Sequence, residues 1–443
     1  MQIKLSDHFT YPHLYRFTLP SIIMMIFTSI YGVVDGLFIS NFVGKEPFAA
    51  INLIFPVIML IGTVGFMMGA GGTAIVSKTL GEKDRERANK YFSFIVYATI
   101  AMGTALALVA FVFMKPLAAL VGAEGNTFKY CVEYGRIVVA AMPFFMIQNL
   151  FQSFFIAAEK PKLGLWVTVA AGITNIVLDA LFVAVFEWGL PGAAAATALS
   201  QVTGAVIPVF YFARKNTSLL RLVRTKFYGN VLLKSMTNGS SELVSNSAAS
   251  LVTMLYNYQL MKFAEEDGVA AYGVIMYIGF IFVAIFIGYS IGCAPIVGYN
   301  YGAKNSPELK NIFKKSTVSL LGTGIVMMVI SLIFAKPLSM IFVNYDKTLL
   351  DITTRGMQIY SFSFIFSGFG IFGSSFFTAL NNGPVSAIIS SLRTLVYQVL
   401  SILLLPIAFG LDGIWFSIIV AETLSFITTW IFIIAKRKKY NYL

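Results

Sequence analysis

The chain has 443 residues, of which 58% are hydrophobic and 12% charged, and its mean hydropathy is +0.80. Soluble domains carry about 25% charged residues, so this composition excludes an ordinary soluble protein. The net charge of +12 does not indicate nucleic-acid binding, because the basic residues lie in short loops and the aromatic residues lie inside the apolar runs.

Cysteine and histidine are too scarce to support metal or disulfide chemistry in these runs. Cys131 and Cys293 lie in or near apolar segments without a metal-binding spacing, and His8 and His13 lie in the polar N-terminal leader. A histidine-based zinc site or catalytic triad in the membrane is therefore excluded. The leader is short and no small-residue cleavage site follows it, so we expect the first apolar run to be retained as a span.

Apolar runs long enough to cross a bilayer recur along the chain, and we count about 12 of them. Several exceed about 25 residues, so tilt or bending is expected, with prolines such as Pro20 within or near the runs. The approximate limits are residues 17–39, 51–77, 91–114, 130–158, 164–187, 192–213, 231–262, 268–298, 313–335, 353–380, 385–409 and 411–435.

Charge in the loops predicts the orientation. If loops alternate between the two sides, one side holds about 23 Lys and Arg residues and the other about 7. The basic side includes both termini, so we predict that both are cytoplasmic. This prediction requires an even number of spans, in agreement with the count.

The two halves of the chain repeat. GGTAIVSKTLGEKD (residues 71–84) recurs as GCAPIVGYNYGAKN (292–305), and FFIAAEKP (154–161) recurs as FFTALNNGP (376–384). The spacing stays at about 221–223 residues, and six spans per half give a parallel repeat, a plan suited to alternating access. We therefore predict an N-terminal lobe at 1–214, a cytoplasmic linker at 215–230 and a C-terminal lobe at 231–443.

The fifth run carries Asn175 and Asp179 near its middle, where a carboxylate costs about 2.5–3.5 kcal/mol. Four residues apart on a helix, the two side chains share one face. Asp35 ends the first run. We interpret Asp35 and Asp179 as a shared cation site that takes up a proton or, with Asn and Thr oxygens, a small hard cation. The alternative is a pair of structural hydrogen bonds between helices.

Other intramembrane charges allow more than one interpretation. Glu242, early in the seventh run, either faces the same cavity and binds a cationic substrate or titrates, or it lies hydrated near the interface. Glu422 and Arg393 are expected to pair structurally in the last two runs. Glu133 and Arg136 are three residues apart and predict a local helix pair.

The order and spacing of these motifs resemble the multidrug and toxic compound extrusion (MATE) family over nearly the whole chain. The resemblance rests on the two six-span halves, on the first-span pattern with Pro20, Tyr31 and Asp35, on TNIVLD with Asn175 and Asp179, and on LPGAAAATA with Thr197.

The resemblance implies an all-α integral membrane protein with 12 transmembrane helices in two pseudo-symmetric six-helix lobes around a central cleft. It implies coupling-cation ligands at Asp35, Asn175, Asp179 and Thr197, with Na⁺ as one candidate. It also implies a bend at Pro20, Tyr31 lining the lobe, and Glu242 as the acidic residue of the seventh span. The tenth span lacks the acidic residue that part of the family has there.

We therefore expect a bacterial inner-membrane antiporter that exports cationic or amphiphilic drug-like molecules in exchange for H⁺ or Na⁺. It would be a monomer in contact with membrane lipids, without a cofactor or a nucleic-acid partner. A flippase for a lipid-linked sugar or other amphiphile is the alternative, but it needs a cationic cleft, and only Arg136 and Arg393 lie within spans. A membrane-embedded enzyme needs a clustered nucleophile, base or metal set, and none appears.

Overall fold

The computed structural model of the chain describes residues 3–443, without the side chains of Val33, Asp35, Leu37, Ser40, Asn41 and Lys45. The predicted cation ligand Asp35 therefore falls outside the described side chains, although its backbone lies within the first helix.

The first half of the chain is helical throughout its long apolar runs, and short π-helical turns interrupt it twice. Its elements are α1 (Tyr11–Phe38), the π-helix η1 (Ile39–Val43), α2 (Lys45–Gly81), α3 (Arg85–Val112), α4 (Met114–Leu120), α5 (Gly125–Ala140), α6 (Met142–Ala157), α7 (Pro161–Asp179), the π-helix η2 (Ala180–Val185) and α8 (Gly189–Ala213).

The second half follows a non-helical connection. Its elements are α9 (Gly229–Gly302), α10 (Ser306–Val343), α11 (Lys347–Ser361), α12 (Phe364–Ala379), α13 (Gly383–Ser391), the π-helix η3 (Leu392–Val396) and α14 (Tyr397–Tyr440).

Two of these helices are too long to be single spans, and backbone breaks divide them. In α9 the chain leaves helical geometry at Ala264 and Glu265, and in α14 it does so at Gly410, where glycine readily adopts the positive φ of 57°. The pairs α5–α6 and α11–α12 are each bent by 54°, and each pair taken together is long and apolar enough for one span. Divided in this way, residues 3–443 contain twelve crossing segments, which overlap the twelve predicted runs and confirm the predicted all-α membrane fold.

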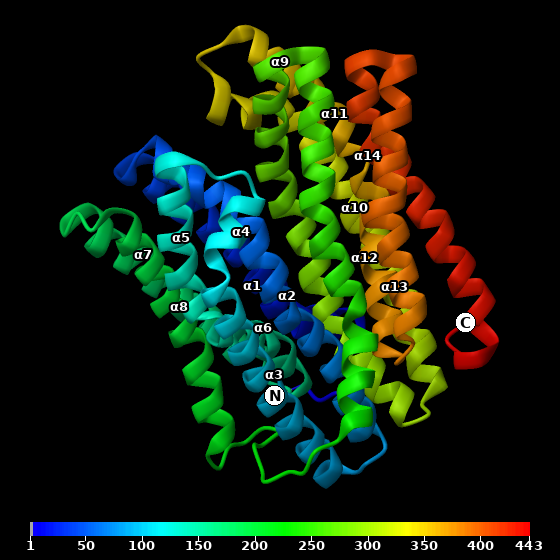
Figure 1. The fold of residues 1–443 in the computed structure, drawn as a ribbon. Helices are drawn as coiled ribbons and strands as arrows, with labels where there is room; N and C mark the ends of the chain where they lie inside the picture. Colours follow the sequence, from blue (N-terminus) through cyan, green and yellow to red (C-terminus); the bar gives the residue numbers. More distant parts are fainter. Residues whose placement is uncertain (1–2) are drawn as a thin grey trace.

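The helices form two groups that meet at one end and diverge at the other (Figure 1). Where they meet, α2 and α9 approach so closely that a Cβ on Gly71 would overlap the carbonyl oxygen of Ser235, and one on Gly239 would overlap that of Met67. The same holds further along, where a Cβ on Gly302 would overlap the Lys78 carbonyl oxygen. Glycine at these positions allows the two halves to touch backbone to backbone.

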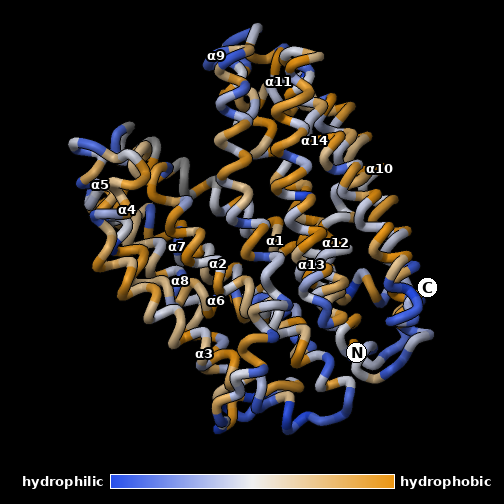
Figure 2. Tube along the Cα trace, turned by 45° about the vertical axis from the view of Figure 1, so that its right-hand side comes forward, coloured by the Kyte–Doolittle hydropathy of each residue, from blue (hydrophilic) through white to orange (hydrophobic). Residues whose placement is uncertain are grey.

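Figure 2 shows hydrophilic segments at both ends of the apolar helices, and the connection between the two halves lies at the end where they meet. The connection between α8 and α9 is fastened to the start of α3: Arg85 donates hydrogen bonds to the carbonyl oxygens of Leu219 and Ser218, at 2.9 and 2.8 Å. The Arg221 amide donates to Asn89 at 2.9 Å. The basic start of α3 and the basic connection between α8 and α9 therefore lie on the same side of the molecule.

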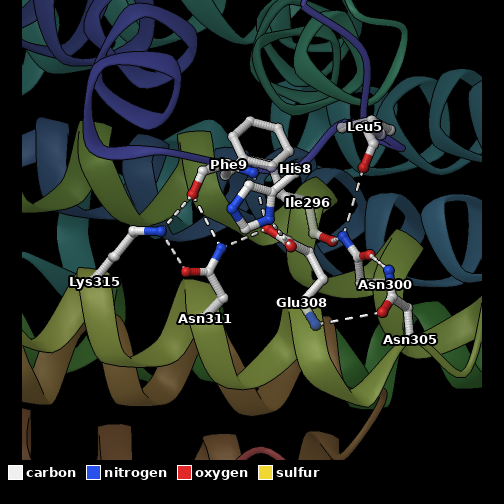
Figure 3. A network of polar contacts seen from close by, with 9 residues as sticks. All are labelled: Leu5, His8, Phe9, Ile296, Asn300, Asn305, Glu308, Asn311 and Lys315. Carbon is white, nitrogen blue, oxygen red and sulfur yellow. Dashed lines mark hydrogen bonds and ion pairs between the residues drawn. The ribbon is translucent and has the colours of Figure 1, made fainter.

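The N-terminal leader is tied to both halves. Leu5 and Phe9 are fully buried, and the Leu5 amide donates a 2.7 Å hydrogen bond to Glu159 between α6 and α7. At its other end, Glu308 of α10 accepts hydrogen bonds from the Phe9 amide at 2.9 Å and pairs with His8 at 2.7 Å. Figure 3 shows this network, in which Glu308 projects from α10 toward the leader.

Candidate cation and substrate site

Asn175 and Asp179 lie on one face of α7 and are 2% and 0% exposed. Asp179 is the last residue of α7, and η2 begins directly after it. π-Helical turns inside α-helices frequently occur at functional sites, because they rotate the side chains that precede them relative to those that follow. The sequence correctly placed these two residues on one buried helix face.

Helix α1 packs on α7 beside this face. A Cβ on Gly172, about one turn before Asn175, would lie 2.5 Å from Cε1 of Phe27 and 3.2 Å from Cδ1 of Tyr31. The absence of a side chain on Gly172 allows the Phe27 and Tyr31 rings to pack directly against α7. Asp35 follows Tyr31 by about one turn along α1.

Helix α8 returns antiparallel to α7 and packs against it. Asp179 and Thr197 are equally far in sequence from Trp188, in the turn between the two helices, and so are Asn175 and Gln201. Residues placed symmetrically about a short turn lie at similar depths on antiparallel helices. This symmetry about Trp188 predicts a similar depth for Thr197 and Asp179, and for Gln201 and Asn175.

Several polar atoms in this region are buried and form no hydrogen bond with the part of the chain that the structure describes. They are Nδ2 of Asn175, Oγ1 of Thr197 and Oε1 of Gln201. Each such atom costs about 1–3 kcal/mol unless it gains a partner. Two of the three are oxygen atoms, the type of ligand that H₃O⁺ and Na⁺ require.

The sequence did not single out Gln201 or the amides of α6. Gln148, Asn149 and Gln152 are all at most 8% exposed, and a Cβ on Gly204 of α8 would lie 2.6 Å from Cδ of Gln148. The sequence feature that could have pointed to these residues is the presence of uncharged amides inside the apolar run MPFFMIQNLFQSFFIA. A hydropathy pattern, however, does not show which of these amides face the interior of the protein.

Glu242 lies at the junction of the two halves. It lines a pocket of about 30 Å³ together with Thr73 of α2 and Ser153 of α6 from the first half, and Ser375 and Thr378 of α12 from the second. This volume holds about one water molecule, whereas drug-sized ligands occupy sites of about 300–1,000 Å³. In this arrangement of the halves the pocket can accept only a very small species.

The predicted pairing of Arg393 with Glu422 is confirmed. The guanidinium makes two contacts with the carboxylate, at 3.0 Å from Nε and 2.9 Å from Nη2, and Glu422 is 3% exposed. A bidentate pair of this kind compensates both charges inside the membrane. Glu422 therefore differs from Glu242, around which the structure places hydroxyl groups.

The predicted helix pair of Glu133 and Arg136 is wrong. Among the described residues no ion pair joins them, and the Arg136 guanidinium instead lies 5.3 Å from the ring centre of Phe111. The three-residue spacing allowed a pair, but the aromatic ring on the neighbouring helix attracts the guanidinium.

Twelve crossing segments in two groups, with amides and carboxylates buried in the interior, are the features of a multi-pass membrane transporter. The MatE family model matches the chain over residues 20–181 and again over residues 243–403. The chain therefore belongs to the MatE family, as the sequence resemblance implied.

Similar proteins agree with this assignment. The chain is 25% identical over 413 residues to the multidrug export protein MepA of Staphylococcus haemolyticus (strain JCSC1435), covering 92% of this chain and 90% of that protein. Its fold matches a crystal structure of MATE in complex with MaL6, with a TM-score of 0.92, 21% identity and 97% of both chains covered.

A second solved structure, the outward-facing conformation of a multidrug resistance MATE family transporter, matches with a TM-score of 0.89 at 21% identity over 97% of this chain and 96% of that one. Both structural matches establish the fold. The curated relatives are export proteins rather than enzymes, in agreement with the prediction that this chain is not an enzyme.

Proposed function

We propose that the protein is a secondary antiporter that exports cationic or amphiphilic drug-like molecules in exchange for H⁺ or Na⁺. The observation that carries the proposal is the fully buried carboxylate of Asp179 beside Asn175 on α7, in the interior of a membrane-spanning helix group. A group so costly to bury is retained where it binds and releases a cation. The similarity to multidrug export proteins supports the choice of cargo.

In the proposed cycle, Asp35 and Asp179 take up the cation from the outside, with Asn175 and Thr197 as further ligands if the cation is Na⁺. Tyr31 borders the site, and α1 bends at Pro20 as it fills. The cation and the drug must favour different arrangements of the two halves, because a ligand that binds both arrangements equally shifts nothing. The moving units are residues 1–214 and 231–443, joined by the linker at 215–230.

Glu242 is the proposed substrate or gating carboxylate at the junction. Its pocket of about 30 Å³ is too small for a drug, so a drug that reaches Glu242 must do so when the halves have separated there. The hydroxyl groups around it can solvate the carboxylate while the halves are closed.

The proposal includes an orientation in a bacterial cytoplasmic membrane, with both termini inside and the protein acting as a monomer. The basic start of α3 lies beside the basic connection between α8 and α9, and this supports the orientation, because basic loops are retained on the cytoplasmic side.

The first prediction tests the cation site. In drug-sensitive cells that lack their own pumps, the protein is expected to lower ethidium accumulation, and collapse of the proton or sodium gradient is expected to abolish this effect. Asp35→Asn and Asp179→Asn should each raise ethidium accumulation to the level of cells without the transporter. The reason is that an uncharged amide can neither take up a proton nor compensate the charge of a bound cation. Fluorescence of the dye in cells, together with the amount of inserted protein, is the measurement.

Asp351→Asn is the matched control, since Asp351 is an exposed aspartate on α11 and its loss should leave export unchanged. Unaltered export in both the Asp35 and Asp179 variants would dismiss the shared cation site. Comparing the effects of collapsing the proton and sodium gradients identifies the coupling ion.

A further inference from the structure

A groove of about 970 Å³ lies on the first half of the molecule, away from the junction. One wall is α5, whose residues Lys129, Val132, Glu133 and Arg136 recur at helical spacing and form a single stripe. The other wall is the end of α3 and the start of α4, with Phe111 and Lys115. Because both walls belong to the first half, the groove is not part of the contact between the two halves.

The groove carries an excess of positive charge over an apolar floor. Lys115, Lys129 and Arg136 line it with Glu133 as the one acidic residue, so its net charge is positive. The Nε atom of Arg136 is buried and forms no hydrogen bond with any described residue, and the guanidinium lies over the Phe111 ring. The remaining lining is mostly apolar, including Phe128 and Ile137. An occupant must therefore offer both a negative charge and a hydrocarbon surface.

The surroundings of the groove face lipid. Leu108, Val112 and Phe113, at the end of α3 beside Phe111, are 64%, 67% and 54% exposed. On a membrane-spanning helix such apolar side chains contact acyl chains. The charged mouth of the groove lies where α3 ends and α5 begins, at the end of the molecule opposite the basic loops, since α3 starts at Arg85 beside the α8–α9 connection.

We propose that this groove is a binding site for one anionic phospholipid, such as phosphatidylglycerol. The lipid phosphate is held by Lys115 and Lys129 at the mouth, and Arg136 supplies hydrogen-bond donors to the phosphate or ester oxygens deeper in the groove. An acyl chain lies along Phe111, Val132 and Ile137. Placing a guanidinium inside a bilayer costs free energy. An anionic headgroup bound next to the guanidinium offsets this cost, because it compensates the positive charge.

A soluble anion fits the groove less well than a lipid. Free phosphate would satisfy the cations but would leave the apolar floor exposed, whereas a phospholipid covers both. The site is independent of the export cycle, because none of its residues belongs to the proposed cation site or to the Glu242 pocket.

The test measures lipid bound to the purified full-length protein by native mass spectrometry, with phosphatidylglycerol or phosphatidylcholine of identical acyl chains. The wild-type protein should bind phosphatidylglycerol preferentially. Arg136→Gln, Lys129→Gln and Lys115→Gln should each weaken this binding by about fivefold, the effect of one basic residue near an anionic lipid surface. Glu133→Gln should strengthen it, because it removes the only acid in the groove.

Arg214→Gln is the matched control, since Arg214 also lies over a phenylalanine ring, at 3.7 Å from Phe210, but outside the groove. It should leave lipid binding unchanged. Equal binding of the two lipids, no effect of the groove variants, or displacement of phosphatidylglycerol by millimolar inorganic phosphate would each overturn the proposal. If Arg136→Gln fails to fold, the exposed Lys115 and Lys129 positions carry the test alone.

Discussion

Glu159 is a single residue that links distant parts of the chain. It lies between α6 and α7 with a positive φ of 59°, is 9% exposed, and accepts the hydrogen bond of the Leu5 amide. Burial raises the pKa of the Glu159 carboxyl above its usual value of 4.5, and the nearby Asp7 raises it further. The Leu5 amide, Lys4 and Lys160 oppose this shift without cancelling it.

The raised pKa of Glu159 predicts a pH dependence of stability. Since the folded protein keeps the proton at pH values where the unfolded chain has lost it, the contribution of Glu159 is greatest below about pH 4.5 and falls as the pH rises through the folded pKa. Subtracting the Tm of Glu159→Gln from that of the wild type should give a difference that decreases from pH 4.5 upward.

The exposed Glu124 supplies the control for this experiment: the same subtraction with Glu124→Gln should vary less with pH. A wild-type advantage over Glu159→Gln that grows with pH would contradict the predicted sign.

At the scale of elements, α3 and α10 have similar first turns, but the glutamate of that turn makes different contacts in the two helices. Both α3 and α10 begin after a residue whose side chain caps the helix, Asp84 and Asn305, and both carry a glutamate in the first turn. In α3 this residue, Glu86, is exposed and pairs with Lys90. In α10 it is Glu308, which is 7% exposed and holds the leader.

Glu308→Ala is therefore expected to release the leader from α10. The variant loses the acceptor for the Phe9 amide and for His8, and hydrogen bonds to a charged group contribute about 1.5–3 kcal/mol each. Cleavage by a protease within residues 3–9 should become at least about tenfold faster, because about 1.4 kcal/mol corresponds to a factor of ten. Timed proteolysis followed by mass spectrometry measures this rate.

Glu86→Ala removes the first-turn glutamate of α3 and should not change the cleavage rate. If both variants are cleaved as slowly as the wild type, the leader is held by its buried Leu5 and Phe9 side chains rather than by Glu308.

At the scale of the whole molecule, α2 and α9 contact each other backbone to backbone where the two halves meet. Figures 1 and 2 both show the two helix groups meeting at one end. There Gly239 of α9 lies against the Met67 carbonyl of α2, and Gly71 lies against the Ser235 carbonyl. A contact with little interlocking of side chains can open and close with few rotamer changes, which suits an alternating transporter.

Gly239→Ala is expected to favour the state in which this end is open, because the added methyl group overlaps the Met67 carbonyl oxygen. Overpacking costs about 1–3 kcal/mol, which is about a 5- to 150-fold change in the equilibrium between the closed and open states. A cysteine at the buried position Ser235 should then react faster with a hydrophilic maleimide.

Gly273→Ala is the matched control in the same helix, since a Cβ there meets no atom within 4 Å. It should leave the labelling rate at Ser235→Cys unaltered. Equal labelling rates in the two alanine variants would show that Gly239 does not control the closed contact.

Much of the fold could be predicted from the sequence because the bilayer imposes a length on every apolar run. The divisions at Glu265 and Gly410 were predictable for the same reason, since a charged cluster and a glycine interrupt runs that are otherwise long enough for two spans. Asn175 and Asp179 could be identified because a buried amide and carboxylate are rare in such runs. The pairing of Arg393 with Glu422 followed from the need to compensate an intramembrane charge.

Other features could not be predicted, because they depend on which helix lies beside which. The sequence by itself determined the twelve spans, the membrane setting and the polar face of α7, since each follows from local hydrophobicity and helical spacing. Only the tertiary structure decided that Gln201 is buried, that Arg136 stacks on Phe111 rather than pairing with Glu133, and that Glu308 holds the leader. These contacts join residues far apart in the chain, and their energies come from atoms brought together by packing, which no local pattern records.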